Sequence, residues 1–292
     1  MTARPHHSTP SALAMLLPSI VVLVVFVAYP LLRTAWLGLF EQDPFGRHRR
    51  WVGLDQYGDV LTSSEFRHSL WVTVCFVALT VPTSLVLGVL LAALANQQLR
   101  GIRVFRTIFA STIATSVAVA SMLWIVLLEP TTGILATFLD AIGQDPIDVL
   151  GDPNTALAGV ALTTIWQNLG LVFVVTLAAM QSIPGVLHES ARMDGHGAST
   201  RFVWITLPLL GPQLLFCSIV LMIGSFETFA QIDMLTEGGP RDATNVLVYS
   251  IVQHMPLDQG RASVEAVLLF LVVGTFSAIQ FRWLDRRVHY AA

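Results

Sequence analysis

Six long apolar stretches dominate this 292-residue sequence and limit what it can fold into. A helix that crosses a lipid bilayer needs about 20 predominantly apolar residues. Only 12% of the residues are charged, whereas an ordinary soluble domain has about 25%. The stretches are continuously apolar rather than alternating, which favours helices over a membrane β-barrel. We therefore expect an all-α integral membrane protein with six transmembrane helices, near 12–32, 69–95, 104–128, 155–181, 210–230 and 264–284.

The first apolar stretch resembles a secretory signal peptide in its position, but two features argue against cleavage. It is longer than the usual apolar region of about 7–15 residues, and it ends in "AYPLL" without a small-x-small cleavage site. We therefore expect an uncleaved first span. The organisation that follows is an N-terminal tail over 1–11, one membrane domain over 12–284 and a C-terminal tail over 285–292.

Arginines in the short loops indicate the orientation of the chain. The segment "NQQLRGIRVFR" between the second and third stretches has three arginines and no acidic residue. The segment "EPTTGILATFLDAIGQDPIDVLGDPN" between the third and fourth has five acidic residues and no basic one. Because positive loops stay in the cytoplasm, we expect both termini there, together with a loop over 182–209.

Residues that could carry catalysis or bind a metal do not cluster in the sequence. Cys75 and Cys217 both fall within apolar stretches, where they are typical of small buried hydrophobic residues. No phosphate-binding loop, zinc-ligand spacing or catalytic triad occurs, so we assign no catalytic residue and no metal ligand. The net charge of −3 is too small to suggest a nucleic-acid partner. A transport pathway is favoured over an enzyme, with energy for uphill transport supplied by an ion gradient or by another subunit.

One polar segment, "ESARMDGHGASTRFVWITLP", interrupts the apolar stretches from Glu189 to Pro208. Residues 186–200 predict a short amphipathic helix that ends at glycine, because Gly195 permits the backbone of a helix C-terminus or a sharp turn. Such a helix on the cytoplasmic face is a shape that a partner protein can hold. Glu189 and Asp194 would offer charges to that partner, and Ala191 would allow close approach.

This segment looks like the cytoplasmic EAA loop of binding-protein-dependent ABC importer permeases. The family pattern is Glu-Ala-Ala, three residues, Gly, nine residues, Ile, one residue and Leu-Pro. Glu189, Ser190, Ala191 and Gly195 occupy the first part of the pattern, followed by Ile205 and Leu207-Pro208 at the matching spacing. Ser190 replaces the first Ala, and His196 replaces the Ala of a longer Asp-Gly-Ala pattern.

The resemblance implies the type I ABC importer permease fold and a coupling helix that sits in a groove of a separate ATPase subunit. The alternative is a solvated connecting loop with a helix cap. The implied partners are a second, homologous permease, two copies of an ABC ATPase, an extracytoplasmic solute-binding protein and membrane lipid. ATP and Mg would be bound by the ATPase subunits, so this chain would hold no cofactor. The implied location is the bacterial plasma (inner) membrane. The residues implied in ATPase coupling are Glu189, Ser190, Ala191, Asp194, Gly195, Ile205 and Pro208.

Other segments resemble the sugar and organophosphate branch of that family, among them "GLDQYGDVL" and "LAAMQSIPGVLHESA". The stretch 226–229 (Phe-Glu-Thr-Phe) is similar to permeases for sn-glycerol 3-phosphate and glycerophosphodiesters such as glycerophosphocholine. Gly-Gly-Pro at 238–240 recurs across sugar permeases and supports the branch only. The expected substrate is a glycerophosphate, and the alternative is a di- or oligosaccharide such as trehalose or maltose.

Polar residues within apolar stretches are the candidates for the pathway, since they are costly in lipid. Glu227 would line the cavity, pair with the partner permease or bind a substrate hydroxyl. Trp166, Gln167 and Asn168 combine an aromatic face with amide donors, which suits a polyol ligand. Interhelical hydrogen bonding remains the alternative for all of them. Two other classes stay open: an ion-driven secondary transporter, for which we find no internal repeat, and a membrane-embedded enzyme, for which no reactive cluster is visible.

Overall fold

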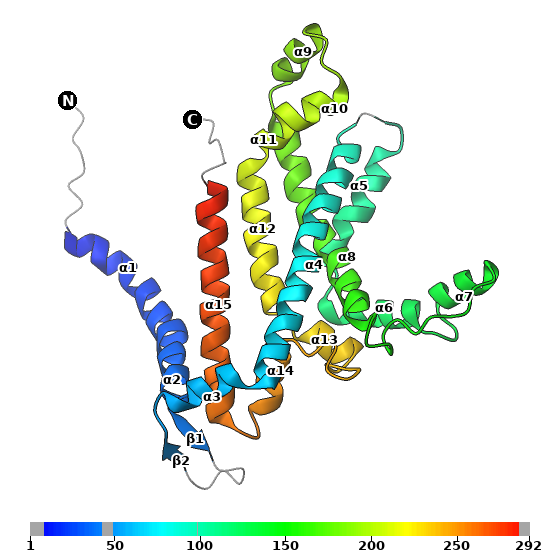
Figure 1. Cartoon of the computed structure of the whole chain (residues 1–292). Coiled ribbons are helices and arrows are strands. Elements are labelled where there is room, and N and C mark those ends of the chain that lie inside the picture. The colour runs from blue at the N-terminus through cyan, green and yellow to red at the C-terminus, as the bar shows by residue number, and fades with distance from the viewer. Residues whose placement is uncertain (1–8, 43–48, 98, 286–292) are drawn as a thin grey trace. The chain divides into compact units, whose positions relative to one another are not determined.

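The computed structural model describes residues 9–42, 49–97 and 99–285 of a largely helical chain (Figure 1). The expected tails, 1–11 and 285–292, lie almost wholly outside the described residues. The chain divides into two compact units, one of residues 1–66 and 251–270 and the other of residues 67–250 and 271–292. The long helices α4 (Ser64–Ala95) and α15 (Gln259–Asp285) contribute residues to both units.

The first unit contains the N-terminal helices and a small hairpin. Strands β1 and β2 pair antiparallel, with Phe40 opposite Trp51. Trp36, Phe40 and Trp51 pack their rings together, with centroids 5.0–5.6 Å apart. The elements up to α4 are α1 (Thr9–Leu23), the π-helix η1 (Val24–Ala28), α2 (Tyr29–Leu37), β1 (Phe40–Gln42), β2 (Arg49–Trp51) and α3 (Asp55–Thr62).

The second unit holds most of the remaining helices around one apolar core. Phe76 of α4, Val160 of α8 and Ile232 of α13 are fully buried in that core. The elements are α5 (Ile102–Ser111), η2 (Thr112–Ala114), α6 (Val117–Leu128), α7 (Ile134–Ala141), α8 (Ala156–Ser182), α9 (Gly185–Met193), α10 (Ala198–Arg201), the π-helix η3 (Phe202–Thr206), α11 (Leu207–Leu209), α12 (Gly211–Phe226), α13 (Ala230–Leu235) and the first half of α14 (Leu247–His254).

Four helices in the described part of the chain are long and apolar enough to cross a membrane, and six segments qualify if each of two bent pairs is one span. The four are 15–37, 64–95, 156–182 and 259–282. The side chains of the first are largely exposed, so they remain available to lipid or to a partner subunit. This composition confirms a helical membrane protein.

The third expected span, 104–128, is not one straight helix. It consists of α5 with η2 and of α6, whose axes differ by 112°. Thr115 between them is extended, and the Ser116 side chain accepts a hydrogen bond from the Val119 amide at the start of α6. A serine that caps a new helix N-terminus stabilises such a break. The fifth expected span, 210–230, likewise differs, since α12 ends at Phe226 and α13 begins at Ala230.

Two π-helical turns precede prolines at corresponding positions. The turn η1 lies before Pro30 and the turn η3 lies before Pro208. In each, the next residue donates its amide five residues back, from Tyr29 to Val24 and from Leu207 to Phe202. Proline has no amide hydrogen and crowds the preceding turn, so a widened turn relieves the conflict without ending the helix.

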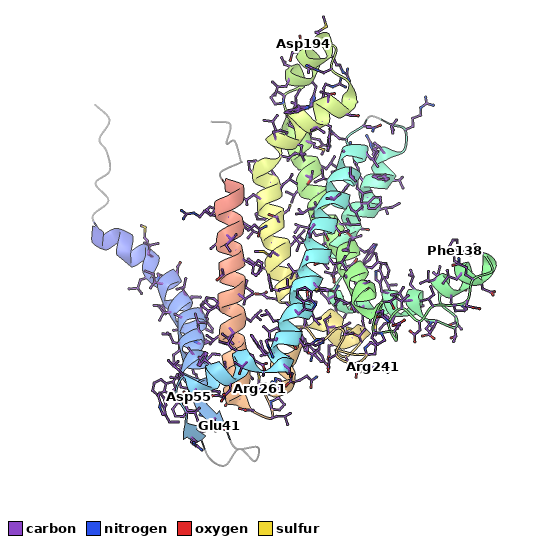
Figure 2. The ribbon with its side chains drawn as sticks, in the orientation of Figure 1. Glu41, Asp55, Phe138, Asp194, Arg241 and Arg261 are labelled. Atoms are coloured by element: carbon purple, nitrogen blue, oxygen red, sulfur yellow. The ribbon has the colours of Figure 1, made fainter. Side chains whose placement is uncertain are left out.

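An ionic cluster joins three helices within the first unit. Arg261 of α15 (labelled in Figure 2) contacts Glu65 of α4 at 2.6 Å and Glu265 at 3.1 Å. The ring of His254 in α14 places Nε2 and Nδ1 each 3.1 Å from a carboxylate oxygen, of Glu65 and of Glu265 respectively. The Glu265 side chain is completely buried. Since ionised carboxylates only accept hydrogen bonds, the doubly protonated ring satisfies both contacts.

This cluster predicts that stability falls as the pH rises. The hydrogen bond to Glu265 raises the pKa of His254 above its ordinary value, although burial opposes the shift. A histidine with a raised folded-state pKa contributes its full stability below the unfolded value of about 6.5 and loses it as the pH rises through the folded value. We expect the purified protein in detergent to unfold at a higher temperature at about pH 6 than at about pH 8.5.

In the His254→Gln variant this pH dependence should shrink. His68→Gln is the matched control, because His68 is exposed and its Nε2 lies 3.0 Å from the Asp242 carbonyl rather than beside carboxylates. The assignment fails if His68→Gln flattens the pH profile as much as His254→Gln does.

Candidate functional site: an exposed helix and a polar cavity

The segment after α8 folds as the short helix α9, which ends at Met193, just before Gly195. The single helix expected over 186–200 is therefore wrong in its C-terminal bound, since a separate helix, α10, begins at Ala198. The Gly195 amide donates to the Arg192 carbonyl and the His196 amide to the Ala191 carbonyl, both at 3.0 Å. Gly195 has a φ of +79°. This pair of bonds with a left-handed residue is the Schellman arrangement, in which glycine is favoured because it has no Cβ. The Arg201 guanidinium donates to the His196 carbonyl at 2.6 Å and so ties α10 to the end of α9.

A hollow of about 530 Å³ brings several of the predicted coupling residues together. Ser190, Ala191 and Asp194 line it from α9 and its end, and Ile205 lines it from η3. Glu189 and Pro208 are exposed but do not line the hollow, and Ala191 alone of the seven is buried.

The surface around α9 and η3 is unusually apolar for an exposed loop. Met193 is 89% exposed and Trp204 is 76% exposed, and Val186 is also largely exposed. Figure 2 shows Asp194 at the far end of α9. Exposed large apolar side chains beside charged ones are typical of a surface that another protein covers.

A second hollow, of about 560 Å³, lies in the same unit where α8 meets the join between α12 and α13. Gln167 and Asn168 line it from α8, and Glu227 lines it from the join. Ile113 and Val117 line it from either side of the break between η2 and α6. Figure 1 shows α13 and α9 at opposite ends of α8. The polar cavity and the exposed helix therefore lie at the two ends of one apolar helix.

The cavity contains three of the four predicted pathway residues. Trp166 does not line it; its ring packs edge-on against Trp124, with centroids 6.3 Å apart. Asn168 makes no hydrogen bond to the described residues, so its amide is available to a ligand. Glu227 is exposed, and the described lining residues include neither arginine nor histidine.

Sequence reasoning missed Gln231 and Thr164, which also line this cavity. The Gln231 side chain is only 4% exposed and donates to the Gln167 carbonyl oxygen at 2.9 Å. A signal for Thr164 was present, because it lies three residues before Gln167 and so on the same face of a helix. Nothing in the sequence pattern connects Gln231 to this face, since 64 residues separate it from Gln167.

The described chain consists mainly of helices (Figure 1), and four of those helices are long and apolar enough to cross a membrane. Together with the exposed helix and the polar cavity, these helices define a multi-pass membrane permease. The chain belongs to the family described as "Binding-protein-dependent transport system inner membrane component", which matches residues 61–290. This membership confirms the resemblance drawn from the EAA-like loop.

Among its relatives are two proteins named sn-glycerol-3-phosphate transport system permease protein UgpA. The one from Yersinia enterocolitica serotype O:8 / biotype 1B is 34% identical, over 94% of each chain. The one from Agrobacterium fabrum is 35% identical, also over 94% of each chain.

The fold is also that of a solved bacterial ABC transporter involved in the import of the acidic polysaccharide alginate. The match has a TM-score of 0.78 and 24% identity, and it covers 94% of this chain and 95% of the other. The same kind of transporter in complex with an alginate pentasaccharide-bound periplasmic protein matches with a TM-score of 0.77 and 22% identity, over 94% and 92% of the two chains. At these identities the likeness shows the fold alone.

Proposed function

We propose that this chain forms half of the transmembrane pathway of an ATP-driven importer, paired with a second permease. Two ATPase subunits would power it and an extracytoplasmic binding protein would deliver the solute. The observation that carries the proposal is the helix α9, with its glycine end and its exposed apolar and charged side chains. ATP hydrolysis would belong to the separate subunits, and this chain would catalyse no reaction of its own.

The loop 182–209 would face the cytoplasm together with both termini. The arginine-rich segment before α5 supports this orientation, as does the acidic segment that holds α7. With α9 inside, the cavity at the other end of α8 would open toward the outside. An ATPase that holds α9 differently in its open and closed forms would bias the two states of the membrane domain.

The proposed substrate is sn-glycerol 3-phosphate or a glycerophosphodiester. Two UgpA relatives at 34% and 35% identity support it. The cavity suits the glycerol part, because Asn168 offers an amide and Glu227 can accept hydrogen bonds from hydroxyls. Since the described lining residues include no base, the charge of the phosphate would be met by the partner permease. A di- or oligosaccharide, which the same groups also suit, is the second candidate.

The test is substrate-stimulated ATP hydrolysis by the complete complex in liposomes. The binding protein would be supplied in turn with glycerol 3-phosphate, glycerophosphocholine, maltose, trehalose or an alginate oligosaccharide. We expect a glycerophosphate alone to stimulate hydrolysis. If only a sugar stimulates hydrolysis, the chain is still part of an importer, but the proposed substrate is wrong. Solute uptake driven by an ion gradient without ATP would contradict the importer itself.

Glu227 gives a prediction about charge selectivity in the cavity. In Glu227→Gln, uptake of glycerol 3-phosphate at low concentration should rise about fivefold. Two like charges about 4 Å apart in water repel by about 1 kcal/mol, which corresponds to that factor. Uptake of a neutral sugar, if any is measurable, should not rise.

The matched control is Asp233→Asn, which neutralises an exposed carboxylate on α13 that does not line the cavity. Equal effects of the two variants would show that general surface charge, rather than Glu227 in the cavity, governs anion uptake.

A further inference from the structure

A chain of side-chain hydrogen bonds crosses the cavity wall and connects three elements. The Thr164 hydroxyl lies 2.6 Å from the Gln231 carbonyl oxygen, to which it donates. The Gln231 amide nitrogen donates to the Gln167 carbonyl oxygen at 2.9 Å. The Gln167 amide nitrogen donates to the backbone carbonyl of Thr115, also at 2.9 Å. We call these four groups the amide chain.

The orientation of each amide is determined by its neighbours. Thr164 is 6% exposed and Gln231 is 4% exposed, so water has little access to their polar atoms. An amide can donate only through nitrogen and accept only through oxygen, and this sequence of bonds has one consistent direction. If Gln231 loses its donor, the Gln167 oxygen loses its partner, and the end of the chain at Thr115 loses its fixed orientation.

The last acceptor lies at the break between η2 and α6. A carbonyl at a helix end has no partner within the helix, and the Gln167 side chain supplies one to Thr115. Gly170, one turn further along α8, fits closely against the same break. A Cβ on Gly170 would lie 2.5 Å from the backbone nitrogen of Ile113. The break is therefore held against α8 both by close packing and by the amide chain.

The cavity is lined by the elements that the amide chain connects. Ile113 and Val117 flank the break, Gln167 and Asn168 come from α8, and Gln231 comes from α13. The two residues on the break contribute apolar side chains, whose positions depend on where the break lies. Breaking the amide chain therefore moves the cavity wall at the break, although the side chains of Ile113 and Val117 themselves are unchanged.

We propose that Gln231 is a positioning residue of the transport pathway, which acts through Gln167 to hold the break at Thr115 in place as one wall of the cavity. The expected effect on transport rests on the proposed function. The positioning of the break by Gln231 does not depend on it. Tight coupling of ATP hydrolysis to solute uptake depends on a cavity wall of fixed shape. Loss of the amide chain therefore loosens that coupling.

The first measurement tests the positioning without any transport assay. A cysteine at Val117, in a chain with Cys75 and Cys217 replaced by serine, would be labelled in membranes by a small water-soluble thiol reagent. We expect Gln231→Leu to raise the labelling rate about 3- to 20-fold, the range that corresponds to loss of an interhelical hydrogen bond. A leucine side chain can neither accept from Thr164 nor donate to Gln167.

Asn168→Leu is the matched control, since Asn168 lines the same cavity and is not part of the amide chain. It should leave the labelling rate of the cysteine unchanged. An unchanged rate in Gln231→Leu, or an equal rise in Asn168→Leu, would overturn the positioning role. If the whole complex does not transport any tested solute, the proposed function is contradicted. The labelling rate of the cysteine still tests the positioning role in that case.

The second measurement counts ATP molecules hydrolysed per solute transported. We expect Gln231→Leu to raise this ratio about 3- to 20-fold, while the half-saturating concentration of the loaded binding protein changes less than about twofold. Gln231→Leu and Gln167→Leu should be non-additive, because both break the same chain. If Gln231→Leu shifts only the half-saturating concentration, Gln231 contacts the ligand directly and the proposal is overturned. Additive effects of Gln231→Leu and Gln167→Leu would also overturn it.

Discussion

Gly195→Asp is expected to abolish solute-stimulated ATP hydrolysis and uptake while leaving normal amounts of the chain in the membrane. Space around Gly195 is open, because a Cβ added there would meet no atom within 4 Å beyond the two adjacent residues. The new carboxylate would lie beside Asp194, at the negative end of α9. In a partner groove, an added like charge costs several kcal/mol, and about 3 kcal/mol corresponds to a factor of about 100.

Gly143→Asp separates this effect from backbone strain. Gly143 also has a positive φ, of +74°, and also has open space around it, but it follows α7 at a distance from the loop 182–209. It should retain most of the activity. Normal uptake by Gly195→Asp, or equal loss in Gly143→Asp, would contradict the coupling role of the loop.

Gly170→Val is expected to lower the yield of folded protein. The added side chain would overlap the hydroxyl of Thr112 and the backbone of Ile113, and the backbone cannot move without displacing η2 from α8. Overpacking of this kind costs about 1–3 kcal/mol or more, and 1–2 kcal/mol changes the ratio of folded to unfolded protein about 5- to 30-fold. The measurement is the yield of monodisperse protein after extraction in detergent.

Gly274→Val is the control for a valine within a long apolar helix. Gly274 lies in α15, and a Cβ added there would meet no atom within 4 Å, so the described chain leaves room for the substitution. Its yield should stay close to that of the wild type. Comparable losses in both variants would show that valine, rather than close packing at the break, is responsible.

The membrane class and the exposed helix could be predicted because their causes are local. Apolar runs determine which segments avoid water, and Gly195 determines where α9 ends. The break at Thr115 was missed because both halves of 104–128 are apolar, so hydropathy continues across it. Ser116 was a weak signal of the break, because serine is a good helix N-cap. Serine also occurs within membrane helices, so its presence alone does not indicate a break.

Contacts between distant residues could not be predicted from one sequence. Arg261 meets Glu65 across 196 positions, and Gln231 meets Gln167 across 64. A polar residue in an apolar stretch indicates that a partner is needed but does not identify it. This is why Glu227, Gln167 and Asn168 could be chosen as candidates from the sequence, whereas Gln231 required the fold.

The bond from Arg201 to the His196 carbonyl has a mechanical consequence. Together with the glycine-ended turn, it ties α9 to α10, so the two short helices are not joined by an unconstrained loop. Torque applied to α9 would be carried through α10 and η3 to the 67° bend at Leu210, beyond which α12 begins. Displacement would thus be concentrated at one flexure, beside the membrane helix that it must tilt.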